Sequence, residues 1–397
     1  MKPDKIRSVQ FIDAFFPTVD GVIQTVHNYA SILNRNSFSC VVAPRGKTPY
    51  RGADLPYKVM WTSSMNLSVA EYRLPTPGLD KNLNTFLNII RPDIFHAHTP
   101  FNEGKFAVKY AKKLGIPCIA TFHSKYYDDV MHIIGSKPIA KMVVADIVNL
   151  YKRMDSVWAC SDGTAETLRS YGYKGDIFIM DNGSSFEIPR EKWPRLKEKA
   201  AHLYGFSPGK KNILFVGHLI WHKNLKLILD AFRELTSDSD DYRLIIAGEG
   251  YDGDAIKAYA EGLGLPPGSV RFIGKVSDRE LLGGIYLNGD IFFFPSVYDN
   301  SPLVVREAAS MGVPSLLTEE SNAAEAVVKD VSGFTAAENT EAMCAELRRI
   351  LTDDALRARV AARAEIDIPQ SWEEIVERVR YKYAEVIDEY NFRHKKG

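Results

Sequence analysis

Cysteine is scarce in this sequence and follows no pattern. The 397 residues contain only Cys40, Cys118, Cys160 and Cys344, which lie far apart and form no CxxC pair. Neither a disulfide framework nor a zinc knuckle fits cysteines that are so widely scattered. Scattered thiols are typical of a reducing compartment, and we therefore expect a cytoplasmic location.

Long apolar runs are also missing. Asp13 interrupts the apolar residues near the N-terminus, so they lack the continuous core of a signal peptide. The longest later candidate, Met142–Leu150, is broken by Asp146 and is too short to span a bilayer. We expect no membrane-spanning segment.

Net charge is absent as well, because 50 Lys and Arg residues balance 50 Asp and Glu residues. The balance hides a difference: residues 1–190 contain 23 basic and 17 acidic side chains, whereas residues 191–397 contain 27 and 33. A nucleic-acid-binding domain is normally far more basic than either half, so nucleic acid is not an expected partner.

What is present is a repeated alternation of short apolar runs with amphipathic stretches, which is typical of βαβ units and parallel sheets. The predicted strands are Ser8–Ile12, Cys40–Ala43, Ile94–Ala97, Cys118–Phe122, Ser156–Cys160 and Ile177–Met180, then Asn212–Val216, Arg243–Ala247, Val270–Ile273, Ile291–Phe294 and Ser315–Leu317. Two such series predict an α/β protein with two doubly wound, Rossmann-like domains facing a central cleft. Ligands in such sheets bind beyond the carboxyl ends of the strands.

The domain boundary is predicted in Asp181–Lys192, where turn-forming residues precede two prolines. We divide the chain into residues 1–185, residues 186–370 and a final helical segment of residues 371–397, which we expect to pack back on the first domain. Residues 45–77 are rich in Pro, Gly and polar side chains, and they predict a loop-rich excursion from the sheet.

The stretch Phe294–Pro314 combines a strand end, a polar loop and a helix that begins near Pro302. A helix N-terminus offers backbone N–H groups and a positive dipole to phosphate. Asp299 in the loop and Glu307 in the helix could accept hydrogen bonds from sugar or ribose hydroxyls. Taken alone, a turn-forming aspartate and an exposed helical acid explain them better.

In the stretch Val216–Phe232, Gly217 follows a strand and a helix begins near Asn224. Lys223 could neutralise a diphosphate, and His218 could donate a hydrogen bond to the same group. Taken alone, a solvated lysine at a helix start is the commoner case. The glycine turn Ala247–Gly250 after the next strand is a weak signal for a nucleotide cradle.

In the first half, Gly21 begins a helix and would let a ligand approach the backbone closely. His96 and His98 share a strand face, but no third ligand stands at suitable spacing, so neither a metal site nor a cofactor is expected. His123 stands at the carboxyl end of its strand and is suited to the cleft. A capped structural histidine is the alternative for His123.

These pieces, in this order, resemble the retaining glycosyltransferases of family four, which have the GT-B fold. The resemblance extends over nearly the whole chain. It rests on Pro17–Gly21, His123, the Gly217–Lys223 element, the Ala247–Gly250 turn, the helix that carries Glu307 and leads into Gly312-Val313-Pro314, and the closing helix from Trp372. The first half is similar to bacterial diacylglycerol glucosyltransferases through DAFFPTVDGV and HAHTPFNEG.

The resemblance implies retaining, metal-independent transfer of a hexose from a nucleotide diphosphate sugar, UDP-linked, to a lipid or saccharide acceptor. The catalytic candidates are His123 beside the reacting carbon, Asp299 at the transferred sugar and Lys223 at the diphosphate. Glu307 would bind the ribose hydroxyls. The other donor-binding candidates are Gly21, Gly217, His218, Ser301, Pro302 and Leu303, and the acceptor-side candidates are His98, Thr99 and Lys125.

The chain departs from the family pattern in places. Asp299 stands where the family has glutamate, His218 where it has arginine, and Ser301-Pro302-Leu303 replaces Phe-Gly-Leu and removes one backbone N–H. Two rival functions stay open. One is a GT-B nucleotide-sugar epimerase, which would need no acceptor. The other, raised by His218 and Asp299, is a GT-B scaffold that binds a nucleotide sugar or a partner without turnover.

The segment Lys137–Arg153 mixes basic and apolar side chains at helical spacing. Such a helix could lie on an anionic membrane surface as a peripheral anchor. Packing within the first domain explains its apolar face equally well.

Overall fold

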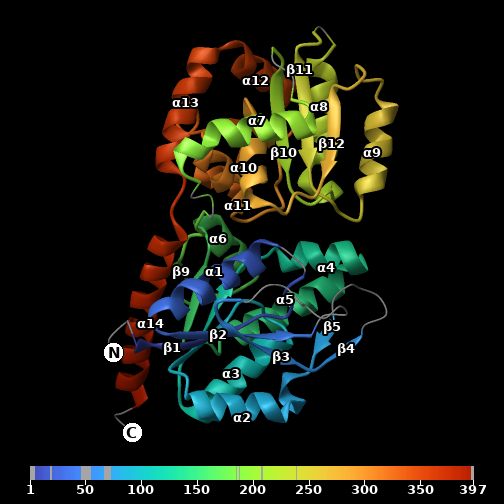
Figure 1. Cartoon of the computed structure of the whole chain (residues 1–397). Coiled ribbons are helices and arrows are strands. Elements are labelled where there is room, and N and C mark those ends of the chain that lie inside the picture. The colour runs from blue at the N-terminus through green and yellow to red at the C-terminus, as the bar shows by residue number, and fades with distance from the viewer. Residues whose placement is uncertain are drawn as a thin grey trace. The chain divides into compact units, whose positions relative to one another are not determined.

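The structure is a computed structural model that describes residues 5–17, 20–45, 55–66, 73–184, 186, 188–206, 209–237 and 239–394. The chain forms two compact units (Figure 1). The first contains Met1–Gly183 together with Trp372–Gly397, and the second contains Ser184–Ser371. The boundaries expected from the sequence lay at residues 185/186 and 370/371. Within the described ranges, every helix is too short or too polar to cross a bilayer.

The first unit is built on a seven-stranded parallel sheet in the order β3-β2-β1-β6-β7-β8-β9. Its strands are β1 Arg7–Phe11, β2 Phe38–Pro44, β3 Lys58–Thr62, β6 Ile94–Ala97, β7 Cys118–Phe122, β8 Ser156–Ala159 and β9 Phe178–Ile179. Its helices are α1 Gly21–Asn36, α2 Lys81–Ile90, α3 Asn102–Leu114, α4 Tyr126–Ile134, α5 Lys137–Tyr151, α6 Asp162–Ser170 and α14 Trp372–His394.

Alternate residues of the first sheet serve two cores. Cys40 and Val42 of β2 pack into a core shared with α2, α3 and α5. Val41 and Ala43 pack against α1 on the other face. Successive side chains of a strand point to opposite faces, so both faces of this sheet are buried beneath helices.

The loop-rich excursion predicted for residues 45–77 is wrong for the part that the structure describes. Residues 58–62 form β3, which pairs with β2 at the sheet edge. Ser64–Asn66 (β4) and Arg73–Pro75 (β5) form a small antiparallel pair. The residues of β3, KVMWT, have strand propensity, but the polar and Pro/Gly-rich neighbours mask it in a sequence window. Residues 46–54 and 67–72 lie outside the described residues.

The second unit contains a six-stranded parallel sheet in the order β12-β11-β10-β13-β14-β15. Its strands are β10 Lys211–Val216, β11 Tyr242–Ala247, β12 Val270–Gly274, β13 Ile291–Phe294, β14 Ser315–Thr318 and β15 Phe334–Ala336. Its helices are α7 Trp193–Tyr204, α8 Leu225–Leu235, α9 Gly253–Gly262, α10 Arg279–Tyr286, α11 Leu303–Ser310, α12 Thr340–Thr352 and α13 Asp354–Asp367. Here β15 was not predicted, because three residues at a sheet edge give too short a pattern.

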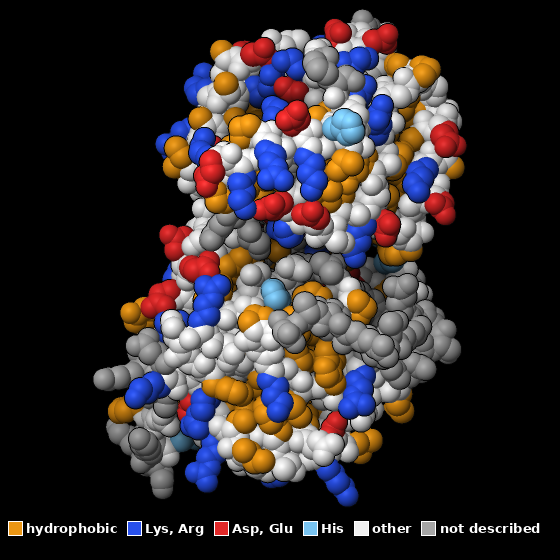
Figure 2. Space-filling model, viewed as in Figure 1, with side chains coloured by type: hydrophobic (Ala, Val, Ile, Leu, Met, Phe, Trp, Pro, Cys, Tyr) orange, Lys and Arg blue, Asp and Glu red, His pale blue; other side chains and the backbone are white. Residues whose placement is uncertain are grey.

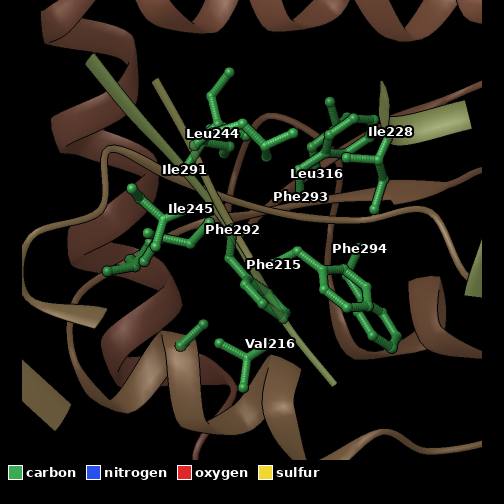
Figure 3. Packing of buried hydrophobic residues seen from close by; sticks show 14 of the residues in the cluster. Phe215, Val216, Ile228, Leu244, Ile245, Ile291, Phe292, Phe293, Phe294 and Leu316 are labelled. Carbon is green, nitrogen blue, oxygen red and sulfur yellow. The ribbon is translucent and has the colours of Figure 1, made fainter. Parts of the chain in front are cut away.

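The core of the second unit is centred on aromatic residues of its middle strands (Figure 3). The rings of Phe215 and Phe294 stack with centroids 5.8 Å apart, and Phe292 stacks on Phe294 at 5.6 Å. All residues of β13 are buried, as expected for a central parallel strand covered on both faces. This packing fixes the ends of β10 and β13, from which the loops of the candidate site emerge.

The surface of the second unit carries both signs of charge. On the face seen in Figure 2, its Lys and Arg side chains are interspersed with Asp and Glu. This distribution agrees with the balanced composition of the chain.

Candidate active site

The central strands β10 and β13 of the second unit lie side by side although β11 and β12 separate them in sequence. Strand order therefore reverses at this point, and loops diverge on either side of it. Ligands of open α/β sheets bind at such a switch point, outside the carboxyl ends of the strands. The loops that follow β10 and β13 carry Lys223 and Asp299.

Lys223, which is buried, and Asp299, which is partly buried, form an ion pair at this position. The Lys223 ammonium donates to Oδ1 of Asp299 at 2.6 Å and to Oδ2 at 2.8 Å. Ser296 Oγ donates to the same Oδ2 at 2.6 Å, and the ammonium lies 5.3 Å from the centroid of the Phe294 ring. Lys223 is only 8% exposed, so the alternative of a solvated lysine at a helix start is wrong.

The pair stands next to the start of α11. The helix was predicted to begin near Pro302. In the structure its first residue is Leu303, and Pro302 is the N-cap residue. The first N–H groups of a helix have no carbonyl partner within the helix, and they carry the positive end of its dipole. An ammonium and a helix N-terminus together can stabilise a negatively charged group such as a diphosphate.

Glu307 lies in the second turn of α11 and is 6% exposed, so it is not the exposed helical acid of the alternative interpretation. Its Oε1 accepts a hydrogen bond from Arg279 at 2.8 Å, and its Oε2 accepts one from the Tyr286 hydroxyl at 3.3 Å. Both donors belong to α10. The site therefore contains a fixed carboxylate that the sequence predicted and two donors that it did not predict.

The glycine turn after β11 has a structural explanation. Gly248 has φ +147°, and a Cβ there would collide with the carbonyl oxygen of Gly217. A Cβ at Gly250 would collide with the carbonyl oxygen of Leu219. The two turns pack backbone against backbone, so these glycines need no ligand to account for them.

The other donor-binding candidates occupy different settings. His218 is exposed beside Gly217, and Ser301, Pro302 and Leu303 are partly buried at the start of α11. In the first unit, Gly21 begins α1, and a Cβ there would meet nothing within 4 Å. Internal packing therefore does not require a glycine at position 21. That a ligand approaches the backbone at Gly21 stays a prediction.

Three buried histidines form a network at the carboxyl ends of β6 and β7 in the first unit. His98 Nδ1 lies 3.2 Å from His123 Nε2, and His98 Nε2 lies 2.9 Å from Gln10 Oε1. Because the Gln10 carbonyl can only accept, His98 donates through Nε2 and accepts from His123 through Nδ1. The network therefore places the His123 proton on Nε2.

His96 joins the same network from within β6. Its Nδ1 bonds the Tyr383 hydroxyl of α14 and its Nε2 bonds Thr121, each at 2.7 Å. Burial lowers the pKa of His96, His98 and His123, that of His123 to about 3. His123 is therefore neutral near pH 7, so it can form hydrogen bonds but supplies no positive charge.

The acceptor-side candidates belong to the framework of the first unit. His98 is fully buried with both ring nitrogens bonded, and Thr99 donates to the Asp13 carboxylate. Lys125 precedes α4 and is partly buried. Their contact with an acceptor stays a prediction.

Sequence reasoning missed a carboxyl cluster next to these histidines. The Asp13 carboxylate also accepts from the backbone N–H of Glu103 at 3.0 Å, and the Glu103 carboxylate accepts from Thr62 at 2.5 Å. Burial, reinforced by the charge of Asp13, raises the pKa of Glu103 to about 8. No periodicity in sequence signals this cluster, because Asp13 follows β1, Thr62 ends β3 and Glu103 lies in the first turn of α3.

Metal ligands do not assemble in the part of the chain that the structure describes: no three His, Cys, Asp or Glu side chains are placed to hold a metal ion there. His96 and His98 lie with ring centroids 4.0 Å apart, but protein groups engage their nitrogens. Metal-independent action stays a prediction.

Comparison with known proteins places these residues in a family. Residues 19–185 match the family model "Glycosyltransferase Family 4", and residues 197–367 match "Glycosyl transferases group 1". Between them the two matches span most of the chain.

Two curated relatives cover long parts of the sequence. Alpha-monoglucosyldiacylglycerol synthase of Streptococcus pneumoniae is 26% identical over 77% of this chain and 69% of its own length. A GDP-mannose-dependent alpha-mannosyltransferase of Corynebacterium glutamicum is 23% identical over 94% of this chain and 88% of its own.

Solved structures share the fold. The Anabaena protein Alr3699/HepE, in complex with UDP and glucose, aligns with TM-score 0.74 and 14% identity over 96% of this chain and all of that one. Sucrose-phosphate synthase from Thermosynechococcus elongatus aligns with TM-score 0.76 and 16% identity over 97% of this chain and all of that one. Both units therefore have the Rossmann-like α/β architecture of the GT-B fold, and the chain belongs to the family-four glycosyltransferases with a group 1 domain as its second half.

Proposed function

We propose that this glycosyltransferase moves a hexose from a UDP-linked donor to a lipid or saccharide acceptor, with retention and without a metal ion. The observation that carries the proposal is the ion pair of buried Lys223 with Asp299, which lies just before the N-terminus of α11. The complex of Alr3699/HepE with UDP and glucose favours a UDP-linked donor, whereas the mannosyltransferase relative uses GDP-mannose. The lipid acceptor is favoured by the diacylglycerol relative.

In the proposed reaction, the bond between the anomeric carbon and the diphosphate oxygen breaks, and the electron pair leaves with the diphosphate. Lys223 and the N–H groups of α11 stabilise the charge that develops there. The acceptor hydroxyl forms its bond on the same face of the sugar, and its proton passes to a leaving phosphate oxygen.

The supporting residues have separate roles in this scheme. Asp299 holds the Lys223 ammonium in place and is proposed to contact the transferred sugar. Glu307 binds the ribose. His123 is proposed to form a hydrogen bond to the sugar as a neutral imidazole, because burial lowers the pKa of His123.

Turnover assays test the proposal. The protein is incubated with UDP-glucose or GDP-mannose, with and without vesicles containing diacylglycerol, and diphosphate release and glycolipid formation are measured. The proposal expects acceptor-dependent release from UDP-glucose and an α-linked product. An inverted product would contradict retention, and full activity in excess chelator is expected. Isomerisation without an acceptor would identify the epimerase, and binding without turnover would identify the scaffold.

We further propose that a lipid acceptor is reached from an anionic membrane surface. Internal packing accounts for much of the apolar face predicted for Lys137–Arg153, because Val144, Ile147 and Leu150 are buried in the first unit. Where α4 passes into α5, however, apolar and basic side chains are exposed together. These residues, which we name the α4–α5 tip, are Ile133, Ile134, Lys137, Ile139, Lys141 and Met142.

The composition of the α4–α5 tip suits a bilayer with negative headgroups. Ile133 is 62% exposed and Met142 is 65% exposed, so both could enter the interface. Residues 130–145 contain two lysines and no acidic side chain, so electrostatic attraction to anionic lipid would add to the apolar contact.

A further inference from the structure

Arg279 occupies a position that helix electrostatics disfavour. It is the first residue of α10, and Asp278 caps the helix by accepting from the N–H of Leu281 at 3.1 Å. A cation at the positive end of a helix dipole is repelled rather than stabilised. A favourable interaction elsewhere should therefore account for the place of Arg279.

The guanidinium of Arg279 makes two such interactions. One nitrogen donates to Glu307 Oε1 at 2.8 Å, and the guanidinium carbon lies 4.1 Å from the centroid of the Phe186 ring. The Arg279 side chain is 46% exposed, whereas the Glu307 side chain is 8% exposed. Arg279 thus reaches from the surface to a buried carboxylate, and the aromatic ring restricts its plane.

Tyr286 fixes the second oxygen of the same carboxylate. Its hydroxyl, at the other end of α10, donates to Glu307 Oε2 at 3.3 Å. Burial raises the pKa of Tyr286 well above its ordinary value, so the phenol keeps the proton that it donates. One helix therefore holds both oxygens of Glu307.

The remaining acceptor capacity of Glu307 matches a diol. An ionised carboxylate offers about four lone-pair positions, and Arg279 and Tyr286 use one on each oxygen. About one position on each oxygen is left, and the adjacent hydroxyls of a ribose offer two donors. We propose that Arg279 is a positioning residue that orients Glu307 so that its carboxylate binds the ribose hydroxyls of the donor nucleotide. This inference rests on the proposed function, in which Glu307 faces the ribose.

A purely structural role for Arg279 would have a different consequence. If the ion pair only joined α10 to α11, its loss would lower stability and would affect every nucleotide equally. If it orients Glu307, its loss should reduce the preference for a nucleotide that carries the 2′-hydroxyl. Lysine cannot replace it fully, because an ammonium lacks the planar fork that stacks on Phe186.

Calorimetric titration of the full chain with UDP and 2′-deoxy-UDP separates these roles, and GDP with 2′-deoxy-GDP is run in parallel. Wild-type protein should bind UDP about tenfold more tightly than 2′-deoxy-UDP, the effect of one hydrogen bond to a charged group. Arg279→Ala should weaken the binding of UDP more than that of 2′-deoxy-UDP, which keeps only the 3′-hydroxyl, so that the preference falls toward one. Arg279→Lys should lie between these values.

The matched control is Arg363→Ala. Arg363 is 52% exposed and pairs with Asp367 on α13, so the change removes a comparable ion pair outside the candidate site. It should retain the tenfold preference. If Arg279→Ala does not fold, the titration is read from Arg279→Lys, which keeps the charge.

Two outcomes would overturn the inference in distinguishable ways. Equal weakening of UDP and 2′-deoxy-UDP, or no change in either, would remove the positioning role and leave the proposed function standing. If the wild-type protein bound neither UDP nor GDP, the proposed function and this inference would both be overturned.

Discussion

At the scale of single residues, the pairing of Lys223 with Asp299 is the feature most directly tied to the proposed reaction. The ammonium is buried and held by both carboxylate oxygens, so it needs little reorganisation to meet a diphosphate. Substituting Lys223 by glutamine removes the charge and keeps a polar side chain of similar length. We expect kcat to fall by roughly 10²–10³, the usual effect of losing one group that stabilises developing charge.

The control for this change is Lys226→Gln. Lys226 pairs with Asp230 on the exposed side of α8 and is 64% exposed, so its loss should leave kcat unchanged. Steady-state kinetics with UDP-glucose and the acceptor provide the measurement. Equal kcat values for Lys223→Gln and wild-type protein would exclude Lys223 from the chemistry.

The buried carboxyl of Glu103 should make the stability of the folded protein depend on pH. Its pKa is about 8 in the folded protein, against an ordinary value of 4.5, because burial and the nearby Asp13 disfavour the charge. The folded state therefore binds more protons than the unfolded state between these values, so the free energy of unfolding falls as pH rises from about 4.5 through 8. The effect should reach the order of a few kcal/mol.

Glu103→Gln tests this prediction, because the amide is neutral at every pH and can still accept from Thr62. Thermal unfolding of both proteins is measured from pH 5 to pH 9. Wild-type protein should lose stability relative to Glu103→Gln as pH rises. Parallel curves would show that the Glu103 carboxyl does not titrate in this range.

At the scale of elements, the apolar side chains of α4 and α5 lie in two environments: some are buried in the first unit, and those of the α4–α5 tip are exposed to solvent. The inner side of α5 packs in the first unit, and the α4–α5 tip exposes apolar side chains with two lysines. The double change Ile133→Glu with Met142→Glu should lower binding to phosphatidylglycerol vesicles by tenfold or more. Apolar burial would be lost and repulsion from the lipid added.

Co-sedimentation provides the measurement, with phosphatidylcholine vesicles as the neutral comparison. Ile366→Glu is the matched control, since Ile366 is 70% exposed on α13 in the second unit. It should bind vesicles like the wild-type protein. Equal binding of wild-type protein to both vesicle types would rule out an electrostatic contribution from the tip.

At the scale of the whole molecule, the first unit is completed by a helix from the other end of the sequence. In α14, Tyr383 bonds His96, and Arg378 pairs with Asp181 at 3.1 Å. The residues of this helix buried in the unit are Trp372, Ile375, Val376, Val379, Arg380, Tyr383, Ala384, Val386 and Ile387. Each large apolar side chain contributes about 1.5–3 kcal/mol on burial, so their sum is comparable with the whole stability of a domain.

A chain that ends at residue 371 should therefore lose the cooperative unfolding of its first unit. Its second unit, which holds Lys223, Asp299 and Glu307 within one continuous segment, should still unfold cooperatively and bind UDP. Scanning calorimetry with and without UDP is the measurement, and the full chain is the control. Two intact transitions in the shortened chain would mean that α14 is dispensable for the fold.

The sequence by itself determined the alternation of strands and helices, and with it the two parallel sheets. Apolar periodicity is local, so β1, β10 and β13 could be placed within a residue or two. The same locality placed Lys223 in the segment that follows β10 and Glu307 in the helix that follows β13. The edge strand β3 was missed because its neighbours lack that periodicity.

Only the tertiary structure decided which side chains meet. Lys223 and Asp299 stand 76 positions apart and pair because β10 lies beside β13, an order that local periodicity does not contain. The bonds from Arg279 to Glu307 and from His98 to Gln10 likewise depend on how helices and strands pack. Such contacts form between elements distant in sequence, so their energies and the protonation of buried groups depend on the assembled fold.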